Sequence, residues 1–97
     1  QVEILDLRTI VPWDKEAVLE SVKRTARCLV VHEDCGTAGF GAEILATIAH
    51  EAFLYLDAPL QRVTGKDCPT PYSKSLMNEV VPSVEQIRAA MEDLLSF

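Results

Sequence analysis

The hydrophobic and polar positions of this chain predict strands and helices in alternation. Short apolar or alternating runs at residues 2–7, 28–31 and 60–64 predict strands. Apolar positions at helical spacing predict helices over residues 14–26, 40–56 and 83–95. The continuous run at 28–31, which stops at residues 32–34, is typical of a parallel strand covered by helices on both faces. This order predicts a three-layer α/β/α fold with a mainly parallel sheet and right-handed crossovers.

Capping residues and helix breakers set the expected boundaries of these elements. Asp14 is a good N-cap for the first helix, and Ser83 with Gln86 forms a capping box for the last. The last helix is expected to bury Val84, Ile87, Met91, Leu94 and Leu95. The glycines before the second helix predict a flexible turn: Gly36, Gly39 and Gly41. A loop without secondary structure is expected around Pro69, Pro71 and Pro82.

Length and composition indicate one small globular domain over residues 1–97. The formal net charge of −6 disfavours binding to phosphate backbones, so nucleic acid is not an expected partner. The longest apolar run, Leu29 to Val31, is too short to cross a membrane. The cysteines, Cys28, Cys35 and Cys68, form no C-x-x-C pair, which favours a reducing compartment over a disulfide framework or a zinc site.

The segment from His32 to Gly41 is the candidate functional site, because it lies where a parallel strand passes into a helix. A phosphate loop is the first hypothesis. The glycine spacing fits neither the dinucleotide nor the Walker pattern, and Glu33 and Asp34 would repel a phosphate. A nucleophilic Cys35 with His32 as its base is the second hypothesis, which the two neighbouring acids disfavour by opposing the thiolate.

Metal binding by the consecutive residues 32–35 is the third hypothesis. Neighbouring strand residues point in alternating directions, so these four side chains would not converge on one ion without a sharp turn. The only other histidine, His50, is expected on the solvated face of its helix. No catalytic, cofactor-binding or metal-binding residue is therefore predicted within the chain.

Several sequence motifs, taken in order, resemble one enzyme family. They are the runs at residues 6–14, 32–34, 39–44, 56–59, 62–65 and 69–72. Together they are similar to the β-type subunit of thiamine-diphosphate-dependent 2-oxo acid dehydrogenases, whose last domain resembles the transketolase carboxy-terminal domain. The resemblance implies that the parent enzyme oxidatively decarboxylates a branched-chain 2-oxo acid or pyruvate. It also implies that thiamine diphosphate and Mg²⁺ bind in other domains and that the isolated chain is inactive.

The resemblance further implies a role in assembly. The expected partners are a second β-type subunit, the α-type subunit and the basic binding domain of the acyltransferase, in the bacterial cytoplasm or the mitochondrial matrix. The interface residues that the resemblance implies are His32, Glu33, Gly39, Phe40 and Gly41. Pro71, Tyr72 and Phe97 are expected to extend the interface, because a long ordered loop without secondary structure usually packs on another surface. Glu92, Asp93 and the carboxylate after Phe97 are expected to meet basic residues of the acyltransferase domain.

Family members precede this segment with two strands and a helix, so we expect a partial domain. One of those strands would lie between residues 2–7 and 28–33. The chain alone is expected either to re-pair these two segments or to cover the gap with another copy. Two alternatives remain: a non-catalytic acidic interaction module, and the last domain of another thiamine enzyme such as a transketolase.

Overall fold

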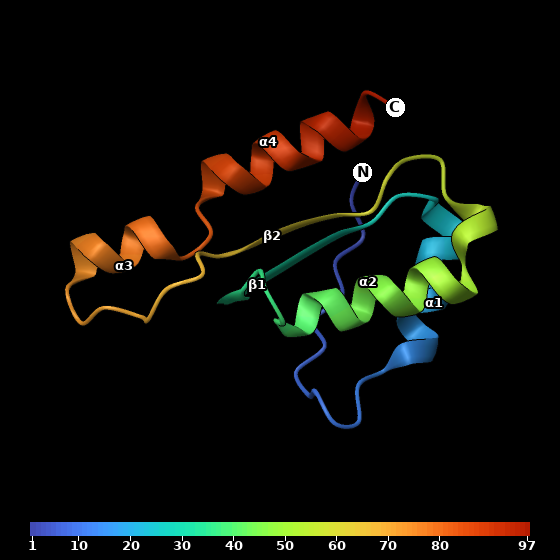
Figure 1. The fold of residues 1–97 in the computed structure, drawn as a ribbon. Helices are drawn as coiled ribbons and strands as arrows, with labels where there is room; N and C mark the ends of the chain where they lie inside the picture. The colour runs from blue at the N-terminus through green and yellow to red at the C-terminus, as the bar shows by residue number, and fades with distance from the viewer.

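The computed structural model describes residues 1–97 and has the predicted α/β fold. Two parallel strands, β1 (Leu29–Cys35) and β2 (Gln61–Gly65), lie between α4 (Val84–Leu95) on one side and α1 (Lys15–Thr25) with α2 (Phe40–Glu51) on the other (Figure 1). A short 3₁₀ helix, η1 (Phe53–Tyr55), follows α2, and α3 (Lys74–Val80) precedes α4. None of these helices has the length and apolar character that a bilayer crossing requires.

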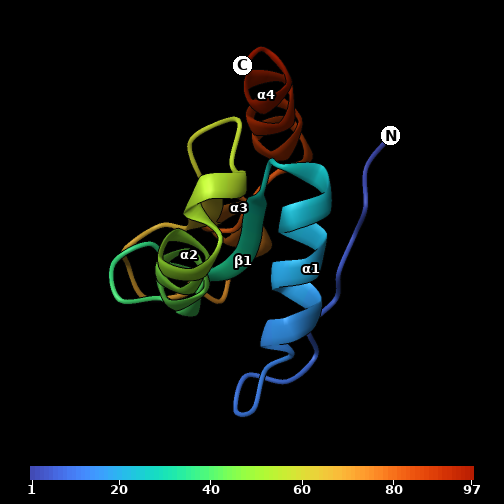
Figure 2. The same ribbon diagram turned by 90° about the vertical axis from the view of Figure 1, so that its right-hand side faces the viewer.

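The sheet has two strands, and the predicted strand at residues 2–7 is wrong. This segment is extended but runs along α1 instead (Figure 2). There Glu3 accepts a 2.6 Å hydrogen bond from Arg24, and Leu7 packs against the core. A strand requires backbone partners from a neighbour, and no strand adjoins this segment. The expected re-pairing with residues 28–33 is therefore also wrong, whereas coverage of the gap by another copy stays a prediction.

Helix α1 begins as its sequence predicts. The Asp14 carboxylate accepts a 3.1 Å hydrogen bond from the backbone N–H of Ala17, which satisfies one of the free donors of the first turn. Val18 and Val22 are buried on the side that faces α2. The helix ends at Ala26, which adopts the left-handed conformation with φ of 65° and returns the chain towards β1.

Helix α2 ends at Glu51, five residues before the predicted end at 56. The backbone N–H of Asp57 donates a 2.9 Å hydrogen bond to the carbonyl oxygen of Ala26 at the end of α1. A straight helix through residue 56 would carry the chain past this contact, so the backbone tightens into η1. As a result Phe53, which lies within the predicted helix, is 66% exposed.

The proline-rich segment contains a helix that the sequence analysis missed. Helix α3 occupies residues Lys74–Val80, which include no proline or glycine. Pro71 and Pro82 therefore bound a helix instead of preventing one. The capping box of α4 is confirmed, because Ser83 Oγ accepts from the Gln86 N–H at 3.1 Å and Gln86 Oε1 accepts from the Ser83 N–H at 2.9 Å.

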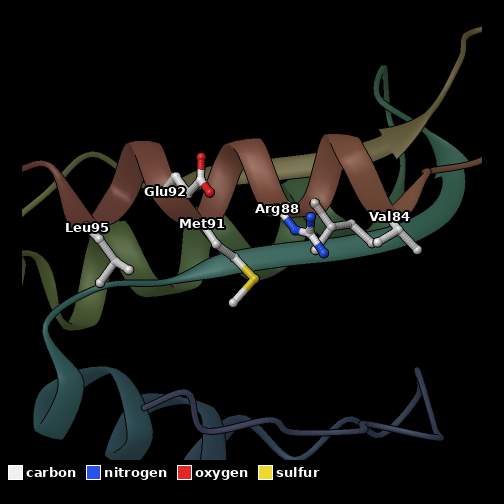
Figure 3. A pocket seen from close by; sticks show the side chains of 6 residues that line it. Val84, Arg88, Met91, Glu92 and Leu95 are labelled. Carbon is white, nitrogen blue, oxygen red and sulfur yellow. The ribbon is translucent and has the colours of Figure 1, made fainter.

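The predicted buried stripe of α4 is largely uncovered. Only Leu94 is buried, while Val84 is 67% and Leu95 is 69% exposed. Figure 3 shows Val84, Met91 and Leu95 pointing from α4 into the open space beside β1. The sheet is only two strands wide, so it does not extend beneath the whole helix. The core lies between α1 and α2 instead, in a buried cluster formed by Val18, Val22, Ile44, Ile48 and Ala52.

Candidate functional site at the carboxyl end of the sheet

Strand β1 continues through the segment where the sequence analysis ended it. Val31 pairs with Val63 and Cys35 pairs with Gly65, so three residues, 32–34, face the single residue Thr64 on β2. Extra residues in one strand form a bulge, which bends the strand and changes the direction of its side chains. The bulge therefore comprises His32, Glu33 and Asp34.

The bulge directs the His32 side chain against the first turn of α2. The backbone N–H of Gly41 donates a 2.9 Å hydrogen bond to His32 Nε2. Because Nε2 accepts, the neutral ring carries its proton on Nδ1. Nδ1 is buried and has no hydrogen-bond partner. An unpaired buried donor costs about 1–3 kcal/mol, which the packing around the His32 ring must offset.

Glycines around His32 permit close packing rather than unusual backbone angles. None has positive φ; the left-handed residue of the turn is Ala38, with φ of 61°. A Cβ atom at Gly39 would overlap the Cys35 carbonyl oxygen, one at Gly41 the His32 ring, and one at Gly65 the Glu33 carbonyl oxygen. The predicted flexible turn is thus a tightly packed one. Its glycines are required by the approach of neighbouring atoms.

A hydrogen-bonded clamp holds the glycine turn to the end of β2. Asp67 accepts a 3.0 Å hydrogen bond from the Thr37 backbone N–H and a second one from the Thr37 hydroxyl, while Arg62 donates to the Gly36 carbonyl oxygen. The hydrogen bonds from Thr37 lower the pKa of Asp67 below its usual value. No motif in the sequence pointed to Asp67, although its place just after β2 puts it at the same sheet edge as Gly36.

Of the other predicted interface residues, Phe40 adjoins the glycine turn, and the rest lie in two separate places. Phe40 follows the turn and stacks edge-to-face on Trp13, with ring centroids 5.9 Å apart. Tyr72 is fully exposed in the segment before α3, and Pro71 beside it is half-buried. Phe97 is 55% exposed beyond α4, where its carbonyl oxygen accepts from Arg27. The structure brings together the residues of the bulge and turn and leaves the other two groups apart.

The geometry bears on each hypothesis of local chemistry. The N–H of Gly41, at the start of α2, is engaged by His32, which removes one donor from any phosphate cradle. No group of three or more histidine, cysteine, aspartate and glutamate side chains is arranged to hold a metal ion. His50 is exposed, as predicted. For the nucleophile hypothesis, His32 makes no hydrogen bond to Cys35, because its Nε2 accepts from the Gly41 N–H and its Nδ1 has no partner.

Comparison with known proteins finds close relatives of two kinds. The mitochondrial 2-oxoisovalerate dehydrogenase subunit beta of Dictyostelium discoideum is 47% identical over 91 residues, which are 92% of this chain and 25% of that protein. The pyruvate dehydrogenase E1 component subunit beta of Rickettsia conorii is 47% identical over 90 residues, which are 93% and 28% of the two chains. Its mitochondrial counterpart from Saccharomyces cerevisiae is 45% identical over 95 residues, or 97% and 26%.

The chain therefore spans about a quarter of the length of the curated relatives that it matches. A family model described as the transketolase C-terminal domain matches residues 1–87. That match covers all elements from the extended amino-terminal segment to the first turn of α4. The fold has the helices and the parallel strand pair that this family implies. The chain belongs to the family of transketolase C-terminal domains.

Proposed function

We propose that this chain is the carboxy-terminal domain of the β-type subunit of a 2-oxo acid dehydrogenase, the decarboxylating component of the complex. The observation that carries the proposal is its 45–47% identity, over more than nine-tenths of its length, to β subunits of pyruvate and 2-oxoisovalerate dehydrogenases. Since a relative of each kind is 47% identical to the chain, the proposed substrate is pyruvate or a branched-chain 2-oxo acid.

Within the parent enzyme, the proposed role of this chain is assembly. The bulge and glycine turn form a surface at the carboxyl end of the sheet, and Glu33 is exposed on it. The proposed contacts with the second β-type subunit and the α-type subunit comprise His32, Glu33, Gly39, Phe40, Gly41, Pro71, Tyr72 and Phe97.

Thiamine diphosphate and Mg²⁺ are proposed to bind outside this chain, where they would supply the chemistry of decarboxylation. The only glycine-rich helix start in the chain is a poor diphosphate site. Its Gly41 N–H already donates to His32, and the acidic side chains of Glu33 and Asp34 belong to the same bulge. No lysine or arginine occurs between residues 32 and 41, and Arg62, which reaches the turn from β2, already donates to the Gly36 carbonyl oxygen. The isolated chain is accordingly proposed to be inactive.

Two incomplete surfaces support the proposal that further polypeptide completes this domain. β1 pairs only with β2, so its other edge has unpaired backbone groups. Beside that edge, the apolar stripe of α4 lines an open groove with Val84, Ile87, Met91 and Leu95 (Figure 3). A strand with a helix behind it would satisfy both surfaces, as would a second copy of the chain.

Docking to the acyltransferase core is proposed to use the acidic character of the chain. Its net charge of −6 complements a basic binding domain. Of the two acids named for this contact, Asp93 already accepts a 2.7 Å hydrogen bond from Gln61, while Glu92 lines the groove on α4. Such an enzyme would act in the bacterial cytoplasm or the mitochondrial matrix.

The test is turnover by the assembled enzyme. The full-length protein, combined with its α-type partner, thiamine diphosphate and Mg²⁺, is expected to decarboxylate pyruvate or 2-oxoisovalerate. The 97-residue chain in the same mixture is expected to release no CO₂. A full-length assembly that converts no 2-oxo acid but transfers ketol groups between sugar phosphates would refute the proposal and favour a transketolase.

A second measurement addresses docking. The acyltransferase binding domain, titrated against the full-length protein, is expected to bind more weakly as salt is raised, because opposite charges are screened. Glu92→Gln should weaken binding, and Glu79→Gln on α3 serves as a control of equal charge. Binding that is insensitive to salt would count against electrostatic docking without affecting the enzymatic assignment.

A further inference from the structure

We propose that His32 is a pH-sensitive latch, which holds the first turn of α2 to the end of β1 only while its ring is neutral. The ring connects these two elements, because it belongs to the bulge of β1 and its Nε2 accepts the 2.9 Å hydrogen bond from the Gly41 N–H. Histidine is the side chain whose charge changes between about pH 5 and 8. The inference concerns the fold of the chain itself and does not depend on the proposed enzymatic function.

The contact with α2 leaves no position for a second proton on the ring. The neutral ring carries its proton on Nδ1, so protonation adds a hydrogen at Nε2, where it would meet the Gly41 N–H. Two donors that face each other repel, and the hydrogen bond between β1 and α2 is lost. The ring has little freedom to turn within the site, since a Cβ atom at Gly39 would lie only 3.1 Å from His32 Cε1. A charged ring must therefore leave the site to reach water.

The surroundings of the ring do not compensate a positive charge. Nε2 lies at the amino end of α2, where the helix dipole is positive and disfavours a cation. Nδ1 is buried without a hydrogen-bond partner, and no carboxylate forms an ion pair with His32. The charged side chains on the elements that adjoin the ring are all exposed, so water screens them: Glu33, Asp34, Glu43, Arg62, Lys66 and Asp67. Water therefore stabilises the charged ring better than the folded site does.

A second contact keeps the rest of the turn in place when the latch opens. Asp67 accepts hydrogen bonds from the backbone N–H and the hydroxyl of Thr37, which precedes Gly41 in the same turn. These hydrogen bonds lower the pKa of Asp67, so its carboxylate stays ionised in mildly acidic solution and keeps both contacts. The turn is therefore expected to open at Gly41 while it stays closed at Thr37. Such a local opening differs from acid unfolding, which would release both residues.

Amide hydrogen exchange of the full chain, followed by NMR from about pH 7.5 to about pH 5.5 and corrected for the intrinsic exchange rates, tests the latch. The protection factor of the Gly41 N–H is expected to fall by about tenfold, because a contact that excludes a proton weakens by up to about tenfold per pH unit. The protection factor of the Thr37 N–H should change by less than about twofold. Gly41 protection that is independent of pH would overturn the inference, and so would an equal loss at both residues.

Two substitutions identify the group that titrates. His32→Gln keeps a side-chain oxygen that can accept from the Gly41 N–H but carries no charge, so Gly41 protection should become independent of pH. His50→Gln is the matched control, because His50 is the only other histidine and is exposed on α2, and it should keep the original pH dependence. The opposite result for either variant would overturn the inference.

A measurement on the unsubstituted chain applies even where His32→Gln fails to fold. The chemical shift of the His32 Cε1 proton reports the charge of the ring directly. It is expected to change over the same pH range as the protection factor of the Gly41 N–H, since one proton controls both. Changes in separate pH ranges would show that another group opens the turn and would contradict the inference.

Discussion

The contact between His32 and Gly41 predicts that Gly41→Ala destabilises the chain when His32 is present and stabilises it when His32 is replaced by alanine. A Cβ atom at Gly41 would overlap His32 Nε2 and lie 2.7 Å from His32 Cδ2 and 3.3 Å from Val30 Cγ1. Gly41→Ala must therefore displace the imidazole ring and break the hydrogen bond from the Gly41 N–H to Nε2. The glycine has ordinary φ, so this overlap is the reason that alanine is disfavoured.

The magnitude follows from three opposing contributions. Overpacking costs about 1–3 kcal/mol, and the lost hydrogen bond about 1 kcal/mol. Alanine in place of a helical glycine returns about 0.5–1 kcal/mol. Gly41→Ala should therefore lower the free energy of unfolding by about 2 kcal/mol. In a His32→Ala background the ring is absent, so the same change should stabilise the chain by about 0.5 kcal/mol.

Equilibrium urea unfolding of the full chain measures both values. Fluorescence of Trp13, the single tryptophan, reports on the site because its ring stacks on Phe40 beside the substituted position. Gly36→Ala is the control, since its Cβ would meet only side-chain oxygens, at 3.1 and 3.6 Å, and should cost less than about 1 kcal/mol. Equal destabilisation by Gly41→Ala with and without His32 would refute the steric explanation.

Three further predictions follow from individual groups. Ala26→Gly should raise the melting temperature by relieving about 1 kcal/mol of left-handed strain at the end of α1, whereas Ala17→Gly inside that helix should lower it. The pKa of Asp67 is lowered in the folded chain, so this carboxylate stabilises the fold above pH 3.8, its ordinary pKa, and loses that effect as the pH falls below it. Asp67→Asn should therefore lower the free energy of unfolding at neutral pH but not at a pH well below 3.8. Exposed Cys68 should react with iodoacetamide much faster than Cys28, whose pKa is raised by burial, and equal rates measured by mass spectrometry would contradict this.

Local sequence signals located the starts of α1 and α4 and the positions of both strands. The N-cap at Asp14 and the capping box at Ser83 fixed the starts of two helices, because the side chain and the N–H that it caps are three residues apart. Apolar runs located β1 and β2, and their separation by a helix implied parallel pairing. The family could also be identified, because its motifs occur along nearly the whole chain.

The site was found in the sequence, but its geometry was not. Its place followed from a strand entering a glycine-rich helix start. The bulge at His32 depends on the register with β2, and the clamp by Asp67 joins residues thirty positions apart. No local pattern specifies such contacts. The glycines illustrate the difference, since their number was visible, but the atoms that require them come from β1 and His32.

What the sequence alone determined was therefore the type and order of α1, β1, α2, β2 and α4, because periodicity and capping act within a few residues. The tertiary structure decided which predicted surfaces were covered. Residues 2–7 have the pattern of a strand but no neighbouring strand with which to pair, and Val84 and Leu95 on α4 remain exposed beyond a sheet two strands wide. An apolar pattern predicts which residues favour burial, whereas burial itself requires another element at the right distance and angle.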